Sequence, residues 1–229
     1  MKRNTLLLTI VLALTLGSAN VIAAQPTDVD VDGIGESVLA VDAGALVEAL
    51  EAKPDDSVLP AGFMNPASGI PANEELVNSF ALPVSQLEGA VGTVTHGLDT
   101  DPSVIPGLVS SGILNYLVYE AEITDDELAN FEESASAGIA DDAESGGEGS
   151  VQTIDIAGVD AVQIEVITEQ SGVAAVVEIV AVPVGNTMVV ATVVSADQGE
   201  VDEARILELA SELSVAGVEN LGIVAESAA

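Results

Sequence analysis

Cysteine and tryptophan are absent from this chain of 229 residues, and His96 is its one histidine. Without cysteine the chain forms no disulfide and has no thiol nucleophile, so a hydrophobic core must supply its stability. With one histidine it lacks most of the side chains that act as general acids or bases at neutral pH. Three Phe and two Tyr are few for the aromatic platforms of sugar-binding sites. These absences disfavour an enzyme, and we expect no catalytic centre.

Basic residues are also scarce, since four Lys and Arg stand against 38 Asp and Glu and give a net charge of −34. Such a charge repels the phosphates of nucleic acids and anionic lipid surfaces, so neither is an expected partner. At molar salt the Debye length falls to about 3 Å and screens this repulsion. The composition is therefore typical of a protein adapted to high salt, with an ordinary acidic secreted protein as the alternative. A positive mean hydropathy of +0.48 argues against disorder.

The N-terminus has the three parts of a secretory signal. Lys2 and Arg3 are followed by an apolar run from Leu6 to Leu16 and by small residues at Ala23 and Ala24. The apolar run is shorter than the roughly 20 residues that span a bilayer, so we expect no stable membrane insertion after cleavage. The pattern predicts a signal peptide over residues 1–24 and a secreted or cell-envelope location, with an uncleaved N-terminal anchor as the alternative.

The rest of the chain divides into an acidic flexible arm at 25–41, a single α+β domain at 42–214 and a C-terminal tail at 215–229. Asp42 is a suitable N-cap for a short helix that ends at Lys53, and the Thr124-x-x-Glu127 capping box predicts a longer helix. The helices predicted inside the domain cover residues 42–53, 74–82, 125–137 and 201–213. A Pro/Gly-rich loop is expected at 59–71, and a solvated loop at 141–150.

Strands are predicted at 87–96, 112–121, 151–156, 161–170, 173–184 and 187–195. The last four are β-branched runs separated by short turns at 157–160, 171–172 and 185–186, which is the spacing of consecutive hairpins. Both parities of 173–184 are largely apolar, so this strand should be covered on both faces. In 161–170 we expect Val162, Ile164 and Val166 to face inward, and Gln163, Glu165 and Glu169 to face outward. The predicted fold is α+β, an antiparallel sheet with a C-terminal four-stranded meander and helices packed on its faces.

The C-terminal third resembles a known fold family. The segment Ile156-Ala157-Gly158-Val159-Asp160-Ala161, the strand residues Met188-Val189-Val190 and the closing helix near Leu207 to Leu213 are similar to the C-terminal half of the PsbP/Mog1-like fold. The resemblance rests on strand spacing and a glycine turn. It implies a non-enzymatic accessory or binding protein, as most members of that group are, and it assigns no functional residue.

One candidate metal site lies in the acidic arm. Asp28, Asp30, Asp32 and Gly33 match the first half of a calcium loop, in which alternate carboxylates converge on the ion. The second half does not match, because Leu39 stands at the twelfth position where a bidentate glutamate is needed. A plain acidic arm is the alternative, so we expect no cofactor, with calcium as the only candidate.

Two further candidates involve Glu165, Glu178 and His96. If Ser171-Gly172 is a two-residue turn, Glu165 lies opposite Glu178 on one face of the sheet, where like charges are destabilising. If the pair is buried, burial raises the pKa of at least one carboxyl group, and the pair shares a proton or binds a cation. The alternative is that both carboxylates are exposed and that salt screens their repulsion. His96, with Asp99 and Asp101 nearby, is either a metal ligand or base whose pKa the carboxylates raise, or a surface loop residue.

Together these patterns predict an exported, acidic, non-catalytic binding or accessory module of the cell envelope or extracellular medium. Its partner is an unknown protein or small-molecule ligand, and a small ligand would lie between the sheet and a covering segment such as the 59–71 loop. The alternatives are a carboxylate-based secreted hydrolase and a calcium-dependent structural protein.

Overall fold

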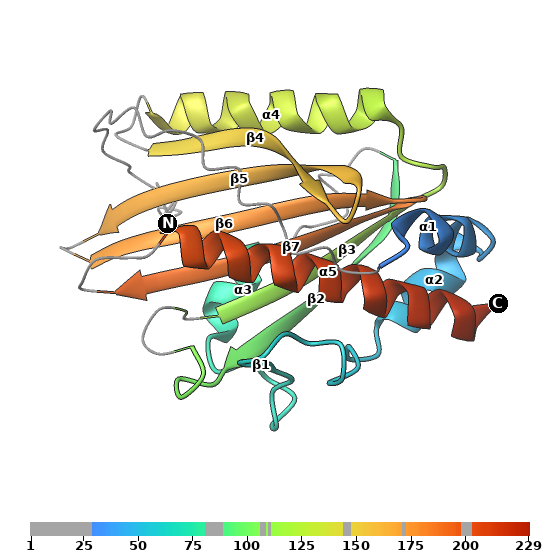
Figure 1. Cartoon of the computed structure of the whole chain (residues 1–229), viewed down its shortest axis with the longest axis horizontal. Helices are drawn as coiled ribbons and strands as arrows, with labels where there is room; N and C mark the ends of the chain where they lie inside the picture. Colours follow the sequence, from blue (N-terminus) through green and yellow to red (C-terminus); the bar gives the residue numbers. More distant parts are fainter. Residues whose placement is uncertain are drawn as a thin grey trace, which may run out of the picture.

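The computed structural model describes residues 29–80, 89–105, 109, 111–143, 148–170, 173–197 and 203–229. The predicted signal peptide at 1–24 lies outside these residues. The described chain folds into one antiparallel sheet with helices on both faces, which confirms the predicted α+β class (Figure 1).

The sheet has seven strands in the order β1-β2-β3-β7-β6-β5-β4. They are β1 (Phe63–Met64), β2 (Ala90–Thr100), β3 (Ser111–Tyr119), β4 (Glu148–Ile156), β5 (Val159–Gln170), β6 (Val173–Val184) and β7 (Thr187–Asp197). Every neighbouring pair is antiparallel, and β4 to β7 form the predicted meander. The β4–β5 turn consists of Ala157 and Gly158, whose φ values of 53° and 88° are those of a tight hairpin turn.

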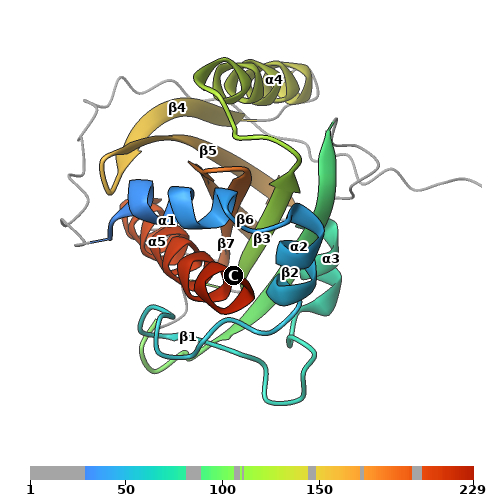
Figure 2. The same cartoon turned by 90° about the vertical axis from the view of Figure 1, so that its right-hand side faces the viewer.

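The described helices are α1 (Val31–Leu39), α2 (Ala43–Leu50), α3 (Glu74–Phe80), α4 (Asp125–Ala143) and α5 (Glu203–Ala228). The sheet curves around α5, and α1 and α2 lie on the same side, whereas α4 lies on the opposite side against β4 and β5 (Figure 2). Both faces of the sheet therefore have a core. The larger includes Leu114, Tyr116 and Val180 with α5, and the smaller includes Leu117, Val162 and Val190 with α4.

Predicted caps at two helix starts are confirmed. The Asp42 carboxylate accepts a hydrogen bond from the Ala45 amide at 3.1 Å at the start of α2. At the start of α4, Glu127 accepts from the Thr124 amide at 2.7 Å, and the Glu127 amide donates to the Thr124 hydroxyl at 3.3 Å. This is the reciprocal capping box, in which Glu127 provides an acceptor for the Thr124 amide.

The prediction of a flexible arm at 25–41 is wrong for the part that the structure describes. Residues Val31–Leu39 form α1, and Asp30 is its N-cap, accepting from the Gly33 amide at 3.1 Å. Val31 and Val38 are buried, and Ile34 packs against the same core. The alternation of Asp and Val at the start of the segment obscured this helical spacing, which places these three residues on one face.

Two helices are longer than predicted. The predicted tail at 215–229 is helical up to Ala228, because Val218, Leu221 and Ala225 continue the buried face of α5. Helix α4 extends to Ala143, past the predicted end at residue 137 and into the predicted loop at 141–150, and β4 begins at Glu148. Small residues such as Ala216 and Gly217 allow α5 to pack closely on the sheet, so they do not end the helix.

The prediction that Gln163 faces outward from β5 is also wrong. Val162 and Ile164 pack in the α4 core as buried side chains, but Gln163, on the opposite face, is buried as well. Helix α5 lies on that second face against β6 and β7, so both faces of the centre of the sheet are covered. Gln163 therefore does not mark an exposed surface.

Candidate functional site

A cleft of about 350 Å³ lies beside β2 at one side of the sheet. Four segments line it, namely the end of α2 with the residues that follow it, the loop before α3, α3 itself and the middle of β2. The lining residues are Glu51, Lys53, Asn65, Pro66, Gly69, Ile70, Pro71, Glu74, Val77, Asn78, Thr95, His96 and Gly97. The loop is part of the 59–71 segment that we expected to cover a ligand, and the cleft lies between this loop and β2. Ligand binding there stays a prediction.

The floor of the cleft is the edge of the sheet. Thr95, His96 and Gly97 are consecutive residues of β2, so their side-chain positions alternate between the two faces of the sheet. A cavity on one face would contact only every second residue, whereas a cavity at the open edge of the strand can contact all three. On this side of β2, strand β1 pairs only with Asp99 and Thr100. The cleft therefore lies over strand edge that β1 does not cover.

Two helices form the walls, one on each face of the sheet. A Cβ atom on Gly92 would lie 2.7 Å from the Val47 side chain of α2, and one on Gly97 would lie 2.7 Å from Val77 of α3. Such distances are shorter than real Cβ contacts, so only glycine lets both helices approach β2 this closely. The two glycines thus bring α2 and α3 to the edge from opposite sides.

His96 is a buried residue with 9% of its surface exposed, and it packs edge-on against Tyr116 with the ring centroids 6.0 Å apart. Its Nε2 lies 2.8 Å from the Leu50 carbonyl oxygen, and because a carbonyl only accepts, Nε2 carries the proton. Burial lowers the pKa of His96, the Leu50 hydrogen bond acts in the opposite direction, and the charge of Lys53 adds to the lowering. The interpretation of His96 as a surface loop residue is therefore wrong, and the expected rise of its pKa is not found. A role as metal ligand or base stays a hypothesis.

The nearby carboxylates instead hold loops in place. Asp99 accepts a hydrogen bond from the Ala72 amide at 2.7 Å. Asp101 accepts from the Ser103 amide at 2.8 Å and from the Ser103 hydroxyl at 2.7 Å, and these bonds lower the pKa of Asp101. Asp99 and Asp101 therefore each have a structural partner in a neighbouring loop.

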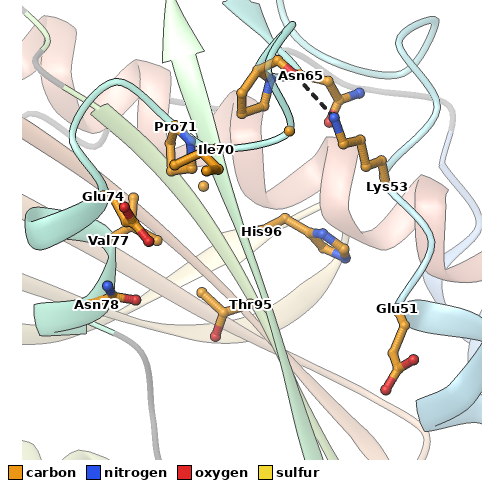
Figure 3. A pocket seen from close by; sticks show the side chains of 13 residues that line it. Glu51, Lys53, Asn65, Ile70, Pro71, Glu74, Val77, Asn78, Thr95 and His96 are labelled. Carbon is orange, nitrogen blue, oxygen red and sulfur yellow. Dashed lines mark hydrogen bonds between the residues drawn. The ribbon is translucent and has the colours of Figure 1, made fainter.

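Polar contacts anchor the loop that covers the cleft. Lys53 Nζ donates a hydrogen bond to the Pro66 carbonyl oxygen at 3.0 Å, which Figure 3 shows as a dashed line. Asn65 Nδ2 donates to the Pro54 carbonyl at 2.8 Å and to the Asp56 carboxylate at 2.6 Å. The loop is thus tied to the residues that follow α2.

Two carboxylates stand at the rim. Glu51 follows α2 and Glu74 begins α3, both are exposed, and in Figure 3 they lie on opposite sides of His96. The cleft therefore combines a polar floor with an acidic rim and with one ammonium group, Lys53, that is held by its loop.

The predicted register of Glu165 and Glu178 is confirmed, because the two residues are partners in the β5–β6 pair. Glu178 has 0% of its surface exposed, and its Oε2 accepts a hydrogen bond from Gln163 Nε2 at 3.1 Å. The interpretation that both carboxylates are exposed and screened by salt is wrong for Glu178. Sharing of a proton or binding of a cation by this pair stays a hypothesis.

The calcium candidate is described only in part. Asp28 lies outside the described residues, Asp30 caps α1, and Asp32 stands in the first turn of that helix. Over the ranges that the structure covers, no group of three or more acidic or histidine side chains is placed to hold a metal ion. Calcium binding at Asp28, Asp30 and Asp32 stays a prediction.

No protein-family model matches the chain, and no curated protein matches its sequence. Within the described part of the chain, none of the helices combines the length and the apolar content that crossing a membrane requires. The cleft residues Glu51, Lys53, Asn65 and Glu74 were not predicted as site residues, because they are ordinary polar residues of short helices and loops. The one sequence signal for the cleft was the Pro/Gly-rich loop.

Proposed function

We propose that this protein is an exported, acidic, non-catalytic binding or accessory module, and that it binds its partner in the cleft over β2. The observation that carries the proposal is the position of the cleft across an open sheet edge, between α2 and α3. A concave site with a few fixed polar groups is the usual form of a ligand site.

The polar side chains of the floor support binding more than catalysis. His96 Nε2 donates to the Leu50 carbonyl, and Thr95 Oγ1 donates to Asn115 Oδ1 at 2.6 Å. A nucleophile needs a base within hydrogen-bond reach, but these two groups each use their hydrogen atom for a structural contact. In the cleft they serve to shape the floor.

The leader, the acidity and the resemblance to the PsbP/Mog1-like fold agree with this proposal. An N-terminal secretory pattern implies export, and a net charge of −34 favours a protein that stays dissolved at high salt. The resemblance to accessory and binding proteins points to the same class of function.

The proposal is tested by recovering partners from the native medium at native salt with three baits. The first is the unaltered protein, the second carries Asn78→Trp to fill the cleft, and the third carries Glu133→Trp on α4 as a control far from it. Asn78 lines the cleft and is exposed, and Glu133 is exposed too, so both variants should fold. We expect a ligand or protein that the first and third baits retain and the second loses. Equal recovery by all three baits would rule out the cleft as the binding site.

A further inference from the structure

Strand β2 has an open edge of defined length. A bulge between Ala90 and Gly92 interrupts its pairing with β3 at one end, and β1 covers Asp99 and Thr100 at the other. Between Gly92 and Leu98, within the described residues, β2 has a neighbouring strand on the β3 side alone. Every second residue of such an edge directs its N–H and C=O groups away from the sheet.

The side chains of this stretch are not of the kinds that usually prevent edge pairing. Edge strands are commonly protected by lysine, proline or charged side chains, and by bulges or covering loops; here the bulge lies at the Ala90 end, and the loop before α3 leaves a cleft over the edge. The sequence from Gly92 to Leu98 contains no Lys, Pro, Asp or Glu, and its Thr93, Val94 and Thr95 are β-branched residues that suit a strand. The open edge is therefore a template for one more strand.

The cleft lies over this edge and adds a charge preference. Glu51 and Glu74 stand at its rim from opposite sides, and the whole chain is strongly anionic. Lys53, the one cation of the lining, donates to the Pro66 carbonyl. The lining thus has two carboxylates against one ammonium group, and this excess of negative charge favours a basic side chain on a segment that enters the cleft.

We propose that the cleft binds an extended peptide segment of another protein, which adds as a strand to β2 and places a Lys or Arg side chain between Glu51 and Glu74. This inference rests on the proposed binding function and names its partner class. Main-chain hydrogen bonds to the edge would supply affinity, and the rim would select for charge. A second copy of this chain fits less well, because it would bring another net charge of −34 to the same edge.

The experiment uses labelled octapeptides on the full folded protein, at the lowest salt at which circular dichroism shows it folded. The parent peptide is Thr-Val-Thr-Arg-Thr-Val-Thr-Val, and an array varies each position through all residue types. Two further peptides carry N-methyl groups on every second amide. In one peptide the methyl groups block the N–H groups along one edge of the strand, and in the other they block those along the opposite edge. We expect the protein to bind peptides of the array and to prefer Arg or Lys at one peptide position. One N-methylated peptide should lose binding and the other should keep it.

Hydrogen exchange reports on the β2 edge directly. On addition of the best peptide, every second amide between Thr93 and Leu98 should become protected from exchange, because a new strand covers the outward N–H groups. Binding without this alternating protection, or equal binding of both N-methylated peptides, would overturn strand addition and leave the proposed binding function intact.

Charge variants test the rim. Glu51→Lys and Glu74→Lys should each weaken binding of the Arg peptide about two- to fivefold and strengthen binding of a Glu peptide, as exposed ion pairs do. Glu48→Lys is the matched control, since Glu48 is exposed on α2 but does not line the cleft.

Two other outcomes refute the peptide proposal alone. The first is that no peptide of the array binds, although Asn78→Trp still abolishes recovery of a native ligand from the medium. The second is that sedimentation shows a dimer of this protein and that Asn78→Trp dissociates it, which would make a second copy the occupant of the cleft.

Discussion

Glu178 is the one carboxyl side chain that is fully buried among the residues that the structure describes, and it lies opposite Glu165 in the sheet. It accepts a hydrogen bond from Gln163, which in turn accepts one from Gln152. A short polar chain thus crosses β4, β5 and β6, from the exposed Gln152 to the buried Glu178. Buried polar groups of this kind specify which residues face each other, but a charge among them is costly.

We predict that Glu178→Gln stabilises the protein by about 1–3 kcal/mol at pH 7, because the amide keeps the shape of the side chain and its acceptor oxygen without a charge to bury. Urea unfolding at pH 7 measures the difference. Glu133→Gln on exposed α4 is the control, and a Glu178→Gln variant that is less stable than the unaltered protein would contradict the prediction.

His96 gives a second prediction at the residue scale. Burial lowers its pKa in the folded state, so the unfolded chain binds a proton first as pH falls. The contribution of His96 to stability is complete above its usual pKa of about 6.5 and is lost as pH falls below that value. We expect His96→Gln to flatten the dependence of the unfolding free energy on pH between 7 and 5, by at most about 1.4 kcal/mol per pH unit.

The single histidine makes this prediction easy to check by NMR. Its ring resonance should titrate below the usual histidine range in the folded protein and within it in urea. A titration midpoint above that range would contradict the structural placement of His96.

At the scale of elements, α5 is held by a polar contact within its apolar face. Asn220 Nδ2 donates to the Tyr116 hydroxyl at 3.1 Å, and Asn220 Oδ1 accepts from the Asp55 amide at 3.2 Å. Tyr116 on β3 donates to the Gly217 carbonyl at 3.3 Å, and burial raises its pKa. One asparagine therefore joins α5 to β3 and to the segment after α2.

Tyr116→Phe removes the hydroxyl from this network and leaves Asn220 short of a partner. We expect a loss of about 1–3 kcal/mol of unfolding free energy, as for other buried hydrogen bonds that lose one group. Tyr119→Phe, at a half-buried residue of the same strand, should change stability much less. Equal effects of the two substitutions in urea unfolding would show that the network adds no stability.

Helix α1 packs on the β6–β7 turn through two glycines. A Cβ atom on Gly35 would lie 3.2 Å from the Gly185 amide nitrogen, and one on Gly185, whose φ is 59°, would lie 2.7 Å from the Gly35 carbonyl oxygen. Gly35→Val should therefore overpack this contact and cost about 1–3 kcal/mol. Hydrogen exchange should show faster opening of α1 than in the exposed control Glu36→Ala, and an unchanged rate would contradict the contact.

At the scale of the whole molecule, the charge of −34 opposes the compact state. The apolar cores on both faces of the sheet must outweigh this repulsion, and salt reduces it by screening. We therefore predict that the melting temperature rises steeply between 0.1 and 3 M KCl. A melting temperature that does not change with salt would contradict adaptation to high salt.

Much of the fold could be predicted because it depends on neighbours in sequence. The capping box at Thr124, the cap at Asp42 and the β4–β5 turn at Ala157 and Gly158 are local, and Glu165 and Glu178 are close enough in sequence for their pairing to be predicted. The length of α5 was missed, since small buried residues at its end resemble a tail when their packing partners are unknown.

The sequence by itself determined the chain's charge, its local elements and the register of the meander, because each follows from composition or from residues close together in the chain. Only the tertiary structure decided that β3 lies beside β7, that α5 packs against β6 and β7, and that β2 forms an edge between α2 and α3. These arrangements join residues far apart in sequence, and they determine the burial of Glu178 and His96 and the place of the cleft. Burial depends on what covers both faces of a strand, which the alternation within that strand does not specify.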